Sequence, residues 1–456
     1  MNANKLPSSS RRAILLDGTP ANDRTGPRVS ATVMKELQSR GWEVEHVVLR
    51  EQKIGNCAGD FFCWIRSPGM CIVDDDNRAI SAAVINSDLT VFLTPVTCGG
   101  YSSELKCMVD HLIQNISPFF TKVEGETHHT RRYERYPDFL AVGWQEKPDA
   151  QAETLFRHLV HRNAINFYSQ HNVCGFVLAD QADTGITAAV HGWLNDLDDG
   201  HSIQDATLPK IDGPAYRARE VHRALLLVGS PRTRKSTSNS LGAYLYGQLG
   251  ASIETETIYL HTILRSPAKL QAMLEAVDAA DLVTLSFPIY VDALPAPVVE
   301  ALSHIAAHRK DRTGSQPQSF IAIANCGFPE AQHTATALAI CELFAQRTGF
   351  QWAGALGLGG GEMIRGADLA KMGGPAIRVK KALELAAAAL VQGQAIPEAA
   401  RTLMAKPAIP AWLYRLAGWY GWKQQAKRYN AGKLLKQQPY MPRAARRRDL
   451  AATVRS

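Results

Sequence analysis

The sequence predicts an α/β protein with two tandem doubly wound domains, each built on a five-stranded parallel sheet of strand order 2-1-3-4-5. Two observations predict this fold class. Short apolar runs alternate with helical patterns along most of the 456 residues, which is typical of βαβ units and a parallel sheet. The apolar run at residues 13–17, which leads into a Gly-Thr-Pro loop and a helical pattern, returns about 210 residues later as residues 224–232, ending in Gly-Ser-Pro-Arg.

Each unit contains five expected strands. In the first unit we expect strands at residues 13–16, 43–49, 89–94, 139–143 and 173–178, with helices at residues 28–40, 76–86, 102–114 and 151–168. In the second unit we expect strands at residues 224–228, 253–259, 282–286, 319–324 and 352–357, and a last helix near residues 373–393. A polar stretch from about residue 180 to 218 breaks the pattern and is expected to be a linker.

These patterns divide the chain into four segments. Residues 1–195 form the first domain, residues 196–218 the linker, residues 219–405 the second domain, and residues 406–456 a basic, aromatic, helical tail. A length of about 150 residues per domain agrees with two or three domains. Hydrophobic residues make up 46% of the chain, which is ordinary for a protein that buries sizeable cores.

Composition also limits location and partners. No apolar run approaches the roughly 18 residues that a membrane-spanning helix needs. Eight cysteines in a chain of this length suit thiols in a reducing compartment better than disulfides, so we expect a cytoplasmic protein. The formal charge of +7 is a local feature: residues 401–456 hold 13 Lys and Arg and one acidic residue, so we expect no nucleic-acid partner.

Ligands of doubly wound sheets lie at the carboxyl ends of the strands, so the loops after strands one, three and four are decisive. In the second unit the first of these loops, residues 229–240, supplies hydroxyls, a fixed charge and the start of a helix, which suit a phosphate monoester. After strand three, prolines stiffen the backbone and Tyr290 is placed to stack on a flat ring. The exposed amides at residues 325–330, after strand four, suit the polar edge of that ring. Helix capping is the alternative role for the hydroxyls of the first loop.

These residues resemble a known family. Gly-Ser-Pro-Arg, Ser-Asn-Ser, Phe-Pro-Ile-Tyr-Val-Asp and Asn-Cys-Gly-Phe-Pro-Glu, within residues 220–400, are similar to motifs of the flavodoxin-like NAD(P)H-dependent FMN reductases. The resemblance implies that the FMN phosphate binds Ser230, Arg232, Ser238, Asn239 and Ser240. It implies that the isoalloxazine lies between two loops, one carrying Pro288, Ile289, Tyr290 and Val291 and the other Asn325, Cys326, Gly327 and Phe328. It also implies a homo-oligomer that pairs across the flavin site.

The first unit resembles the iron–sulfur flavoproteins of the same superfamily, over residues 12–178. The signals are Gly18-Thr19-Pro20, the cysteine-bearing segment at residues 57–76, and the loop at residues 94–101. The resemblance implies a second FMN site, so that one or two FMN bind per chain, with contacts from Thr19, Thr25, Thr94, Pro95, Val96, Thr97, Gly99 and Gly100. Pro27 stands where the second unit has Ser238 and removes a backbone N–H donor, so we expect this phosphate site to be the poorer one.

The cysteine-bearing segment departs from the pattern of the iron–sulfur flavoproteins, in which four closely spaced cysteines hold a cubane cluster. Asp60 stands at the second position, which leaves Cys57, Cys63 and Cys71. A carboxylate is a harder and weaker ligand for iron than a thiolate. We therefore expect no bound metal and favour a cysteine-lined turn near the flavin, with an iron–sulfur cluster as the open alternative. Cys98 and Cys326, in the expected flavin loops, are expected to pack there and not to react.

Two further segments leave alternatives open. His128 and His129 lie in an insertion between strands three and four; because adjacent side chains point different ways, we expect a solvated loop over the active site and no metal site. The tail carries aromatic residues from Trp412 to Trp422, interleaved with Lys and Arg at helical spacing. That pattern suits either a helix lying on an anionic membrane or docking onto the body of the protein, and we favour docking.

The sequence thus predicts an NAD(P)H-dependent FMN oxidoreductase, in which FMN takes hydride from NAD(P)H and passes electrons to an acceptor that the sequence does not identify. We predict no catalytic side chain, because the flavin carries the chemistry and the sequence shows no Ser-His-Asp or His-Glu constellation. The alternative is an electron-transfer protein that carries flavin, meets a protein partner and has no nicotinamide site of its own.

Overall fold

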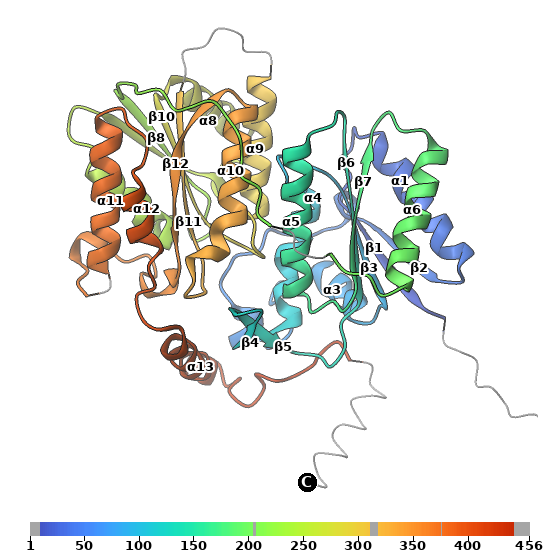
Figure 1. Ribbon diagram of the computed structural model, residues 1–456. Helices are drawn as coiled ribbons and strands as arrows, with labels where there is room; N and C mark the ends of the chain where they lie inside the picture. Colours follow the sequence, from blue (N-terminus) through green and yellow to red (C-terminus); the bar gives the residue numbers. More distant parts are fainter. Residues whose placement is uncertain (1–9, 204–206, 311–317, 375, 442–456) are drawn as a thin grey trace, which may run out of the picture.

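The computed structural model describes residues 10–203, 207–310, 318–374 and 376–441. Two five-stranded parallel sheets stand side by side, each with helices on both faces (Figure 1). Counted within its own unit, each sheet has the strand order 2-1-3-4-5, so the predicted fold class is confirmed. Among the helices of the described residues, none is both long enough and apolar enough to cross a membrane.

The first unit contains every strand and helix that the sequence predicts for it. From edge to edge its sheet runs β2 (Glu43–Val48), β1 (Arg12–Asp17), β3 (Leu89–Pro95), β6 (Asp138–Gln145) and β7 (Asn172–Leu178). Its helices are α1 (Thr25–Ser39), α2 (Phe62–Ile65), α3 (Asn77–Ile85), α4 (Ser103–His111), α5 (Ala150–Asn166) and α6 (Asp183–Asp198). The central strands β1 and β3 are almost wholly buried because helices cover both faces of the sheet.

Helix α6 corrects the expected linker, which was placed from about residue 180. Ile186, Val190 and Leu194 recur every four residues and bury one face of this helix against α1 and the sheet. Polar residues such as Asn195 and Asp198 lie on its exposed face. The polar composition of the stretch therefore concealed an amphipathic helix that completes the first unit.

The insertion between the third and fourth strands also differs from the expected solvated loop. It folds as an antiparallel hairpin of β4 (Ile116–Val123) and β5 (Glu126–Arg131). Thr127 and His128 on β5 are buried. The hairpin is covered because a helix near the end of the chain packs on β4.

The second unit repeats the architecture of the first. Its sheet runs β9 (Glu254–Tyr259), β8 (Arg223–Val228), β10 (Leu282–Pro288), β11 (Gln318–Asn325) and β12 (Phe350–Leu358). Its helices are α7 (Thr237–Gly247), α8 (Pro267–Ala279), α9 (Ala296–Arg309), α10 (Ala335–Arg347), α11 (Ala376–Val391) and α12 (Glu398–Ala405). Helices α7, α11 and α12 cover one face, and α8, α9 and α10 the other.

The two units meet through equivalent helices. α4 packs on α9 and α5 packs on α10, and in each pair both helices follow the same strand of their own unit (Figure 1). Both third strands also end in the same turn, closed by Thr97 and Gly100 in the first unit and by Tyr290 and Ala293 in the second. One hydrophobic core runs from the first sheet through these helices to the second sheet. The two units of one chain thus contact each other through equivalent helices, as the resemblance implies for two copies of a protein. Whether two chains also pair, as a homo-oligomer, stays a prediction.

The tail docks onto the body of the protein. Helix α13 (Ala411–Lys427) packs on β4 and α2, beside the cysteine-bearing segment. Beyond it, the guanidinium of Arg132 donates hydrogen bonds to the carbonyl oxygens of Leu435 (3.2 Å) and Gln437 (2.8 Å). Docking is therefore the arrangement of the described part of the tail, and it brings α13 to the boundary between the two units.

Candidate functional site

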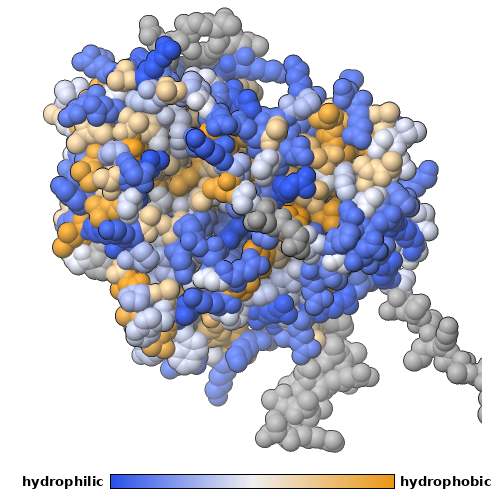
Figure 2. All heavy atoms as spheres, in the orientation of Figure 1, coloured by the Kyte–Doolittle hydropathy of each residue, from blue (hydrophilic) through white to orange (hydrophobic). Residues whose placement is uncertain are grey.

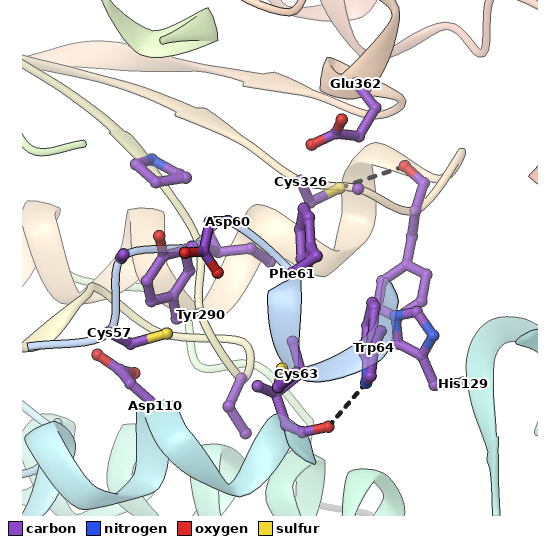
Figure 3. A pocket seen from close by; sticks show the side chains of 18 of the residues that line it. Cys57, Asp60, Phe61, Cys63, Trp64, Asp110, His129, Tyr290, Cys326 and Glu362 are labelled. Carbon is purple, nitrogen blue, oxygen red and sulfur yellow. Dashed lines mark hydrogen bonds between the residues drawn. The ribbon is translucent and has the colours of Figure 1, made fainter. Parts of the chain in front are cut away.

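A cavity of about 630 Å³ lies where the two units and α13 meet. One wall consists of the loops after strands one, three and four of the second unit, one of the cysteine-bearing segment of the first unit, and one of α13. This volume is within the range of about 300–1,000 Å³ that is usual for small-molecule and cofactor sites. Figure 3 shows Cys57, Asp60 and Cys63 of the first unit close to Tyr290 of the second.

One end of the cavity is polar and suits a phosphate. Ser230, Arg232 and Ser238, predicted for this role, line it together with Ser236 and Thr237, which sequence reasoning missed. All five lie between the end of β8 and the first turn of α7. Backbone N–H groups of a first helical turn have no partner within their helix, and the helix dipole adds positive potential there. The fixed charge of Arg232 adds positive potential at this end, as a phosphate site would need.

Two residues predicted for the phosphate point elsewhere in this structure. Asn239 accepts a hydrogen bond from the Tyr259 hydroxyl (2.9 Å) through Oδ1 and donates one to the Arg234 carbonyl oxygen (3.2 Å) through Nδ2. Ser240 donates a hydrogen bond to the Ser236 carbonyl oxygen (3.3 Å), and neither residue lines the cavity. Ser236 lines the cavity instead, and its hydroxyl caps α7 by accepting the Asn239 N–H (3.0 Å). A serine directly before the first helical residue is a favoured N-cap, and this position was the signal that could have identified Ser236.

The predicted ring loops converge on the cavity. Pro288, Ile289, Tyr290, Val291, Asn325, Cys326, Gly327 and Phe328 all line it. Val291 (φ 50°) and Asp292 (φ 58°) are in the left-handed region, which is strained for residues other than glycine. Two donors from the first unit hold this turn: Asn163 Nδ2 bonds to the Val291 carbonyl oxygen (3.1 Å) and Lys106 Nζ to that of Tyr290 (2.9 Å). The first unit therefore fixes the shape of the second unit's ring loop.

Two predicted residues of the ring loops are occupied by internal contacts. The Asn325 amide donates hydrogen bonds to Ser238 Oγ (2.9 Å) and the Phe287 carbonyl oxygen (3.0 Å), which ties the ring loop to the phosphate loop. Cys326 is buried, and its burial raises the pKa of its thiol to about 12. Burial raises the pKa of Cys98 to about 12 as well. Both thiols are therefore protonated at neutral pH, which favours packing over reaction.

The cysteine-bearing segment faces this cavity, although it belongs to the first unit. Cys57, Asp60, Cys63 and Cys71 all line it. Burial raises the pKa of the Cys57 thiol to about 12 and that of Cys63 well above its usual range. Burial also raises the pKa of Cys71, but hydrogen bonds from His111 and the Val73 backbone outweigh it and leave that pKa below its usual value.

These residues do not fit a cubane iron–sulfur cluster with four thiolate ligands. Asp60 takes the place of one thiol, and its Oδ1 accepts the backbone N–H of Phe62 within its own turn (3.0 Å). We assign no reaction step to a cluster at this segment.

The two units also touch directly across the cavity. The Arg232 guanidinium donates a hydrogen bond to the Gly59 carbonyl oxygen and lies over the Phe61 ring, 5.5 Å from its centre. A side chain at position 59 would meet the Tyr290 hydroxyl at 1.9 Å, and φ there is +60°, so this close approach requires glycine. These partners are more than 170 residues apart along the chain, so the sequence alone did not predict their contact.

Helix α13 closes the remaining side. The Tyr414 hydroxyl donates a hydrogen bond to the Gly327 carbonyl oxygen (2.6 Å), next to the predicted ring site. Trp422 packs edge-on against Phe61 and Trp64, at centre distances of 5.4 Å and 5.3 Å. These aromatic rings form an apolar wall of the cavity. The tail is thus part of the site, a role that its composition alone did not indicate.

The equivalent phosphate loop of the first unit already holds carboxylates. Asp23 Oδ1 accepts the backbone N–H groups of Thr25 (2.8 Å) and Gly26 (2.9 Å) at the start of α1, where a phosphate would bind. Trp144 Nε1 donates to the other oxygen of Asp23 (2.7 Å). The Thr19 hydroxyl donates to buried Asp17. Two carboxylates therefore place negative charge where the resemblance implies an anionic ligand.

The first unit's other predicted flavin loop packs against the second unit. Thr97 and Gly100 border a void of only about 20 Å³ that is otherwise lined mainly by residues of α9 and α10 and the turn before α9. A Cβ at Gly99 would lie 2.8 Å from the Leu155 side chain. The eight residues predicted to bind the second FMN, Thr19, Thr25, Thr94, Pro95, Val96, Thr97, Gly99 and Gly100, all lie outside the large cavity.

Comparison with known proteins identifies the type of unit. Residues 11–133 match the NADPH-dependent FMN reductase family. The iron-sulfur flavoprotein of Archaeoglobus fulgidus is 26% identical over 102 residues, which are 22% of this chain and 46% of that protein. The chain thus spans about half the length of this curated relative. The family match lies in the first unit, so it confirms a resemblance to FMN reductases there, and the curated match confirms the resemblance to iron–sulfur flavoproteins. The resemblance of residues 220–400 to FMN reductases stays a prediction.

Solved structures that match part of this chain include a quinone oxidoreductase and an azoreductase. An NAD(P)H:quinone oxidoreductase from Methanothermobacter marburgensis is 15% identical, with 36% of this chain and 96% of that chain covered and a TM-score of 0.28. An FMN-dependent NADH-azoreductase from Bacillus anthracis, in complex with FMN, is 11% identical, with 37% of this chain and all of that chain covered and a TM-score of 0.29.

Proposed function

We propose that this protein is an NAD(P)H-dependent FMN oxidoreductase with one working flavin site, formed by the second unit and closed by the first unit and α13. The observation that carries the proposal is the cavity between the units. It joins a phosphate end at Arg232 and the start of α7 to the two ring loops at residues 288–292 and 325–328. These three loops follow strands one, three and four of a doubly wound sheet, where such folds bind their ligands.

On this proposal the residues of the cavity bind and orient the flavin and keep water away from it. Arg232 and the hydroxyls of the phosphate loop balance the charge of a phosphate monoester. The strained turn at Val291 and Asp292 is held in place by the first unit, so the backbone groups that would meet the ring edge are positioned before binding. FMN held by these residues would supply the redox chemistry, hydride transfer from NAD(P)H and electron transfer to an acceptor. We assign no side chain as a general acid or base.

The first unit serves, on this proposal, as a structural partner without its own flavin. The carboxylates of Asp17 and Asp23 occupy its phosphate loop, and its strand-three turn is buried against the second unit. A bound phosphate would bring a third negative group beside them, which is unfavourable at short distance. One FMN per chain follows from this arrangement.

The purified protein is therefore expected to contain close to one FMN per chain. A visible spectrum with protein quantification measures this ratio, and anaerobic addition of NADPH or NADH tests hydride transfer by bleaching of the flavin band. Prompt bleaching with a ratio near one supports the proposal. A ratio near two would contradict the single site. A flavin that neither nucleotide bleaches would favour the alternative, an electron-transfer protein without a nicotinamide site.

The exposed face of α13 favours contact with a membrane surface as an additional property. Its large apolar side chains are exposed by 38–62%: Trp412, Leu413, Leu416, Trp419 and Tyr420. Figure 2 shows hydrophobic residues at the lower left, where Figure 1 places α13. Arg415, Lys423 and Lys427 accompany them, a combination that suits an anionic lipid surface. An acceptor dissolved in the membrane would then reach the cavity beside this helix, whereas the cytoplasmic location stays a prediction.

Replacing Trp412, Leu416 and Trp419 together by serine is expected to lower binding to vesicles rich in anionic lipid by about tenfold or more, because the apolar area that enters the interface is lost. Co-sedimentation with such vesicles and with neutral vesicles measures the effect. Ile377→Ser on α11, which is 60% exposed, is the matched control and should bind as the unaltered protein does. Equal binding by the triple variant would contradict the membrane contact.

A further inference from the structure

A second cluster of polar side chains joins the two units beside the flavin cavity. Glu126 and His128 lie on β5 of the first unit. His333 lies on the 3₁₀ turn η5 (Ala331–Thr334) of the second unit, and Glu330 immediately precedes it. One ligand atom from each of Glu126, His128 and His333 lies within 4.8 Å of the others. None of these residues has a role in the flavin site described above.

The Nε2 atoms of His128 and His333 each face a glutamate oxygen without making a hydrogen bond within the described residues. His128 and His333 are each only 1% exposed. The Nε2 atoms of both rings and Oε2 of Glu330 are buried and make no hydrogen bond within the described residues. His128 Nε2 lies 3.4 Å from Glu126 Oε2, and His333 Nε2 lies 3.7 Å from Glu330 Oε2. Buried polar atoms without partners are costly, so their convergence needs a cause.

The groups behind these atoms hold them in place. His128 Nδ1 lies 3.1 Å from Asn166 Oδ1, and His333 Nδ1 lies 3.6 Å from the Asp292 carboxylate. Both contacts lie on the ring nitrogen opposite the unpartnered one. The contact of His128 matches a metal-bound histidine, whose other nitrogen is usually oriented by a carbonyl or carboxylate. His333 Nδ1 lies nearer to the Arg162 guanidinium, at 3.0 Å, than to Asp292.

The carboxylates are held in the same manner. Glu330 Oε1 accepts a hydrogen bond from the Thr127 hydroxyl (2.8 Å), which leaves Oε2 directed at the cluster. Glu126 Oε1 accepts one from Gln332 (2.6 Å). Each glutamate thus has one oxygen fixed by a residue of the opposite unit.

The charge of the cluster is negative. Three carboxylates, those of Glu126, Asp292 and Glu330, face one cation, Arg162 of α5, so a net charge of about −2 remains when both histidines are neutral. Arg162 lies 2.5 Å from Glu126 Oε2, 3.5 Å from Asp292 and 3.0 Å from His333 Nδ1. Burial lowers the pKa of His333, but its contacts with Asp292 and Glu330 outweigh burial and raise that pKa to about 9, so a proton on His333 removes part of this imbalance. The remaining negative charge favours a bound cation.

We propose that Glu126, His128 and His333, with Glu330 as fourth ligand, bind a divalent transition-metal ion of the zinc class between the two units. Two imidazole nitrogens and two carboxylate oxygens form a four-ligand set of the type that zinc accepts. The ion would supply the missing positive charge and join the hairpin of the first unit to the loop that carries Phe328. With four protein ligands the site is structural, so no reaction step is assigned to it.

The test uses the full-length chain with Cys57, Cys63 and Cys71 replaced by serine, so that thiols cannot contribute zinc binding. After treatment with a chelator, the protein is titrated with Zn²⁺ and, in parallel, with Co²⁺. We expect one ion per chain by elemental analysis, and a Co²⁺ spectrum of a tetrahedral site with nitrogen and oxygen ligands. Circular dichroism verifies that each sample is folded.

Variants assign the ligands. His128→Ala and His333→Ala are each expected to abolish stoichiometric binding. Asn166→Ala, which contacts His128 from behind, should weaken binding by about 10–100-fold with the fold intact. His129→Asn is the matched control, since this neighbouring, partly buried histidine lines the flavin cavity and is not part of the cluster, and it should bind one ion. Folded protein that takes up no Zn²⁺, or equal uptake by Asn166→Ala, His128→Ala and the control, would overturn the proposal and leave an ion-pair network centred on Arg162.

Discussion

Replacing Arg232 and Ser238 together by alanine is expected to weaken FMN binding by about 100- to 1,000-fold and to yield a protein that is colourless as purified. Arg232 supplies the fixed positive charge at the phosphate end of the cavity, and Ser238 is a buried hydroxyl in the first turn of α7. A hydrogen bond to a charged group contributes about 1.5–3 kcal/mol, a neutral one about 1 kcal/mol, and each 1.4 kcal/mol is tenfold in affinity. Fluorescence titration of the apoprotein with FMN measures the loss.

Arg234→Ala is the matched control for this variant. Arg234 belongs to the same loop but lies over the Tyr259 ring, 5.9 Å from its centre, and does not line the cavity. Its replacement should leave FMN affinity within about threefold, a difference below 1 kcal/mol. Because Arg232 also contacts Gly59, Arg232→Lys separates its two roles: the lysine keeps the charge and should retain part of the affinity. Unchanged FMN content in the double variant would contradict the phosphate site.

Lys106→Met is expected to destabilise the protein by about 3–5 kcal/mol and to weaken FMN binding at the same time. Lys106 is only 1% exposed, pairs with the Asp110 carboxylate, and donates a hydrogen bond to the Tyr290 carbonyl oxygen (2.9 Å). Burial raises the pKa of Asp110, and Lys106 opposes that shift. Methionine therefore leaves a buried carboxylate without its counter-charge and releases the ring loop. Denaturant unfolding and an FMN titration measure the two effects.

The double variant Lys106→Met with Asp110→Asn separates charge from positioning. The asparagine oxygen still accepts the Ala296 backbone N–H, which Asp110 binds at 3.0 Å, but no unpaired charge remains. We expect most of the lost stability to return, since replacing both partners of a buried pair costs far less than removing one. FMN affinity should stay low because the Tyr290 carbonyl oxygen still lacks its donor. A stable single variant with full affinity would show that Lys106 does not support the ring loop.

Much of the fold could be predicted because it depends on local periodicity. The five strands of each unit and the helices between them follow from short apolar runs and amphipathic spacing, and the loops at Ser230, Tyr290 and Asn325 follow from their positions after strands. Helix α6 was not predicted because only four of its 16 residues are buried, namely Ile186, Val190, Leu194 and Leu197, and the segment around them is polar. Ser236 and Thr237 were missed because a one-residue change in where a helix begins decides which side chains face the cavity.

The sequence by itself determined two doubly wound sheets and the loops at their carboxyl ends, because strand and helix periods and turn residues act over a few neighbouring positions. Only the tertiary structure decided that the cysteine-bearing segment of the first unit and the tail helix complete the second unit's cavity, that Asp23 holds the backbone donors of the first unit's phosphate loop, and that His128 meets His333. Most of these contacts join residues that are far apart along the chain, and the contact of Asp23 depends on the orientation of its side chain. They are set by how the equivalent helices of the two units pack, and no short segment of sequence records that packing.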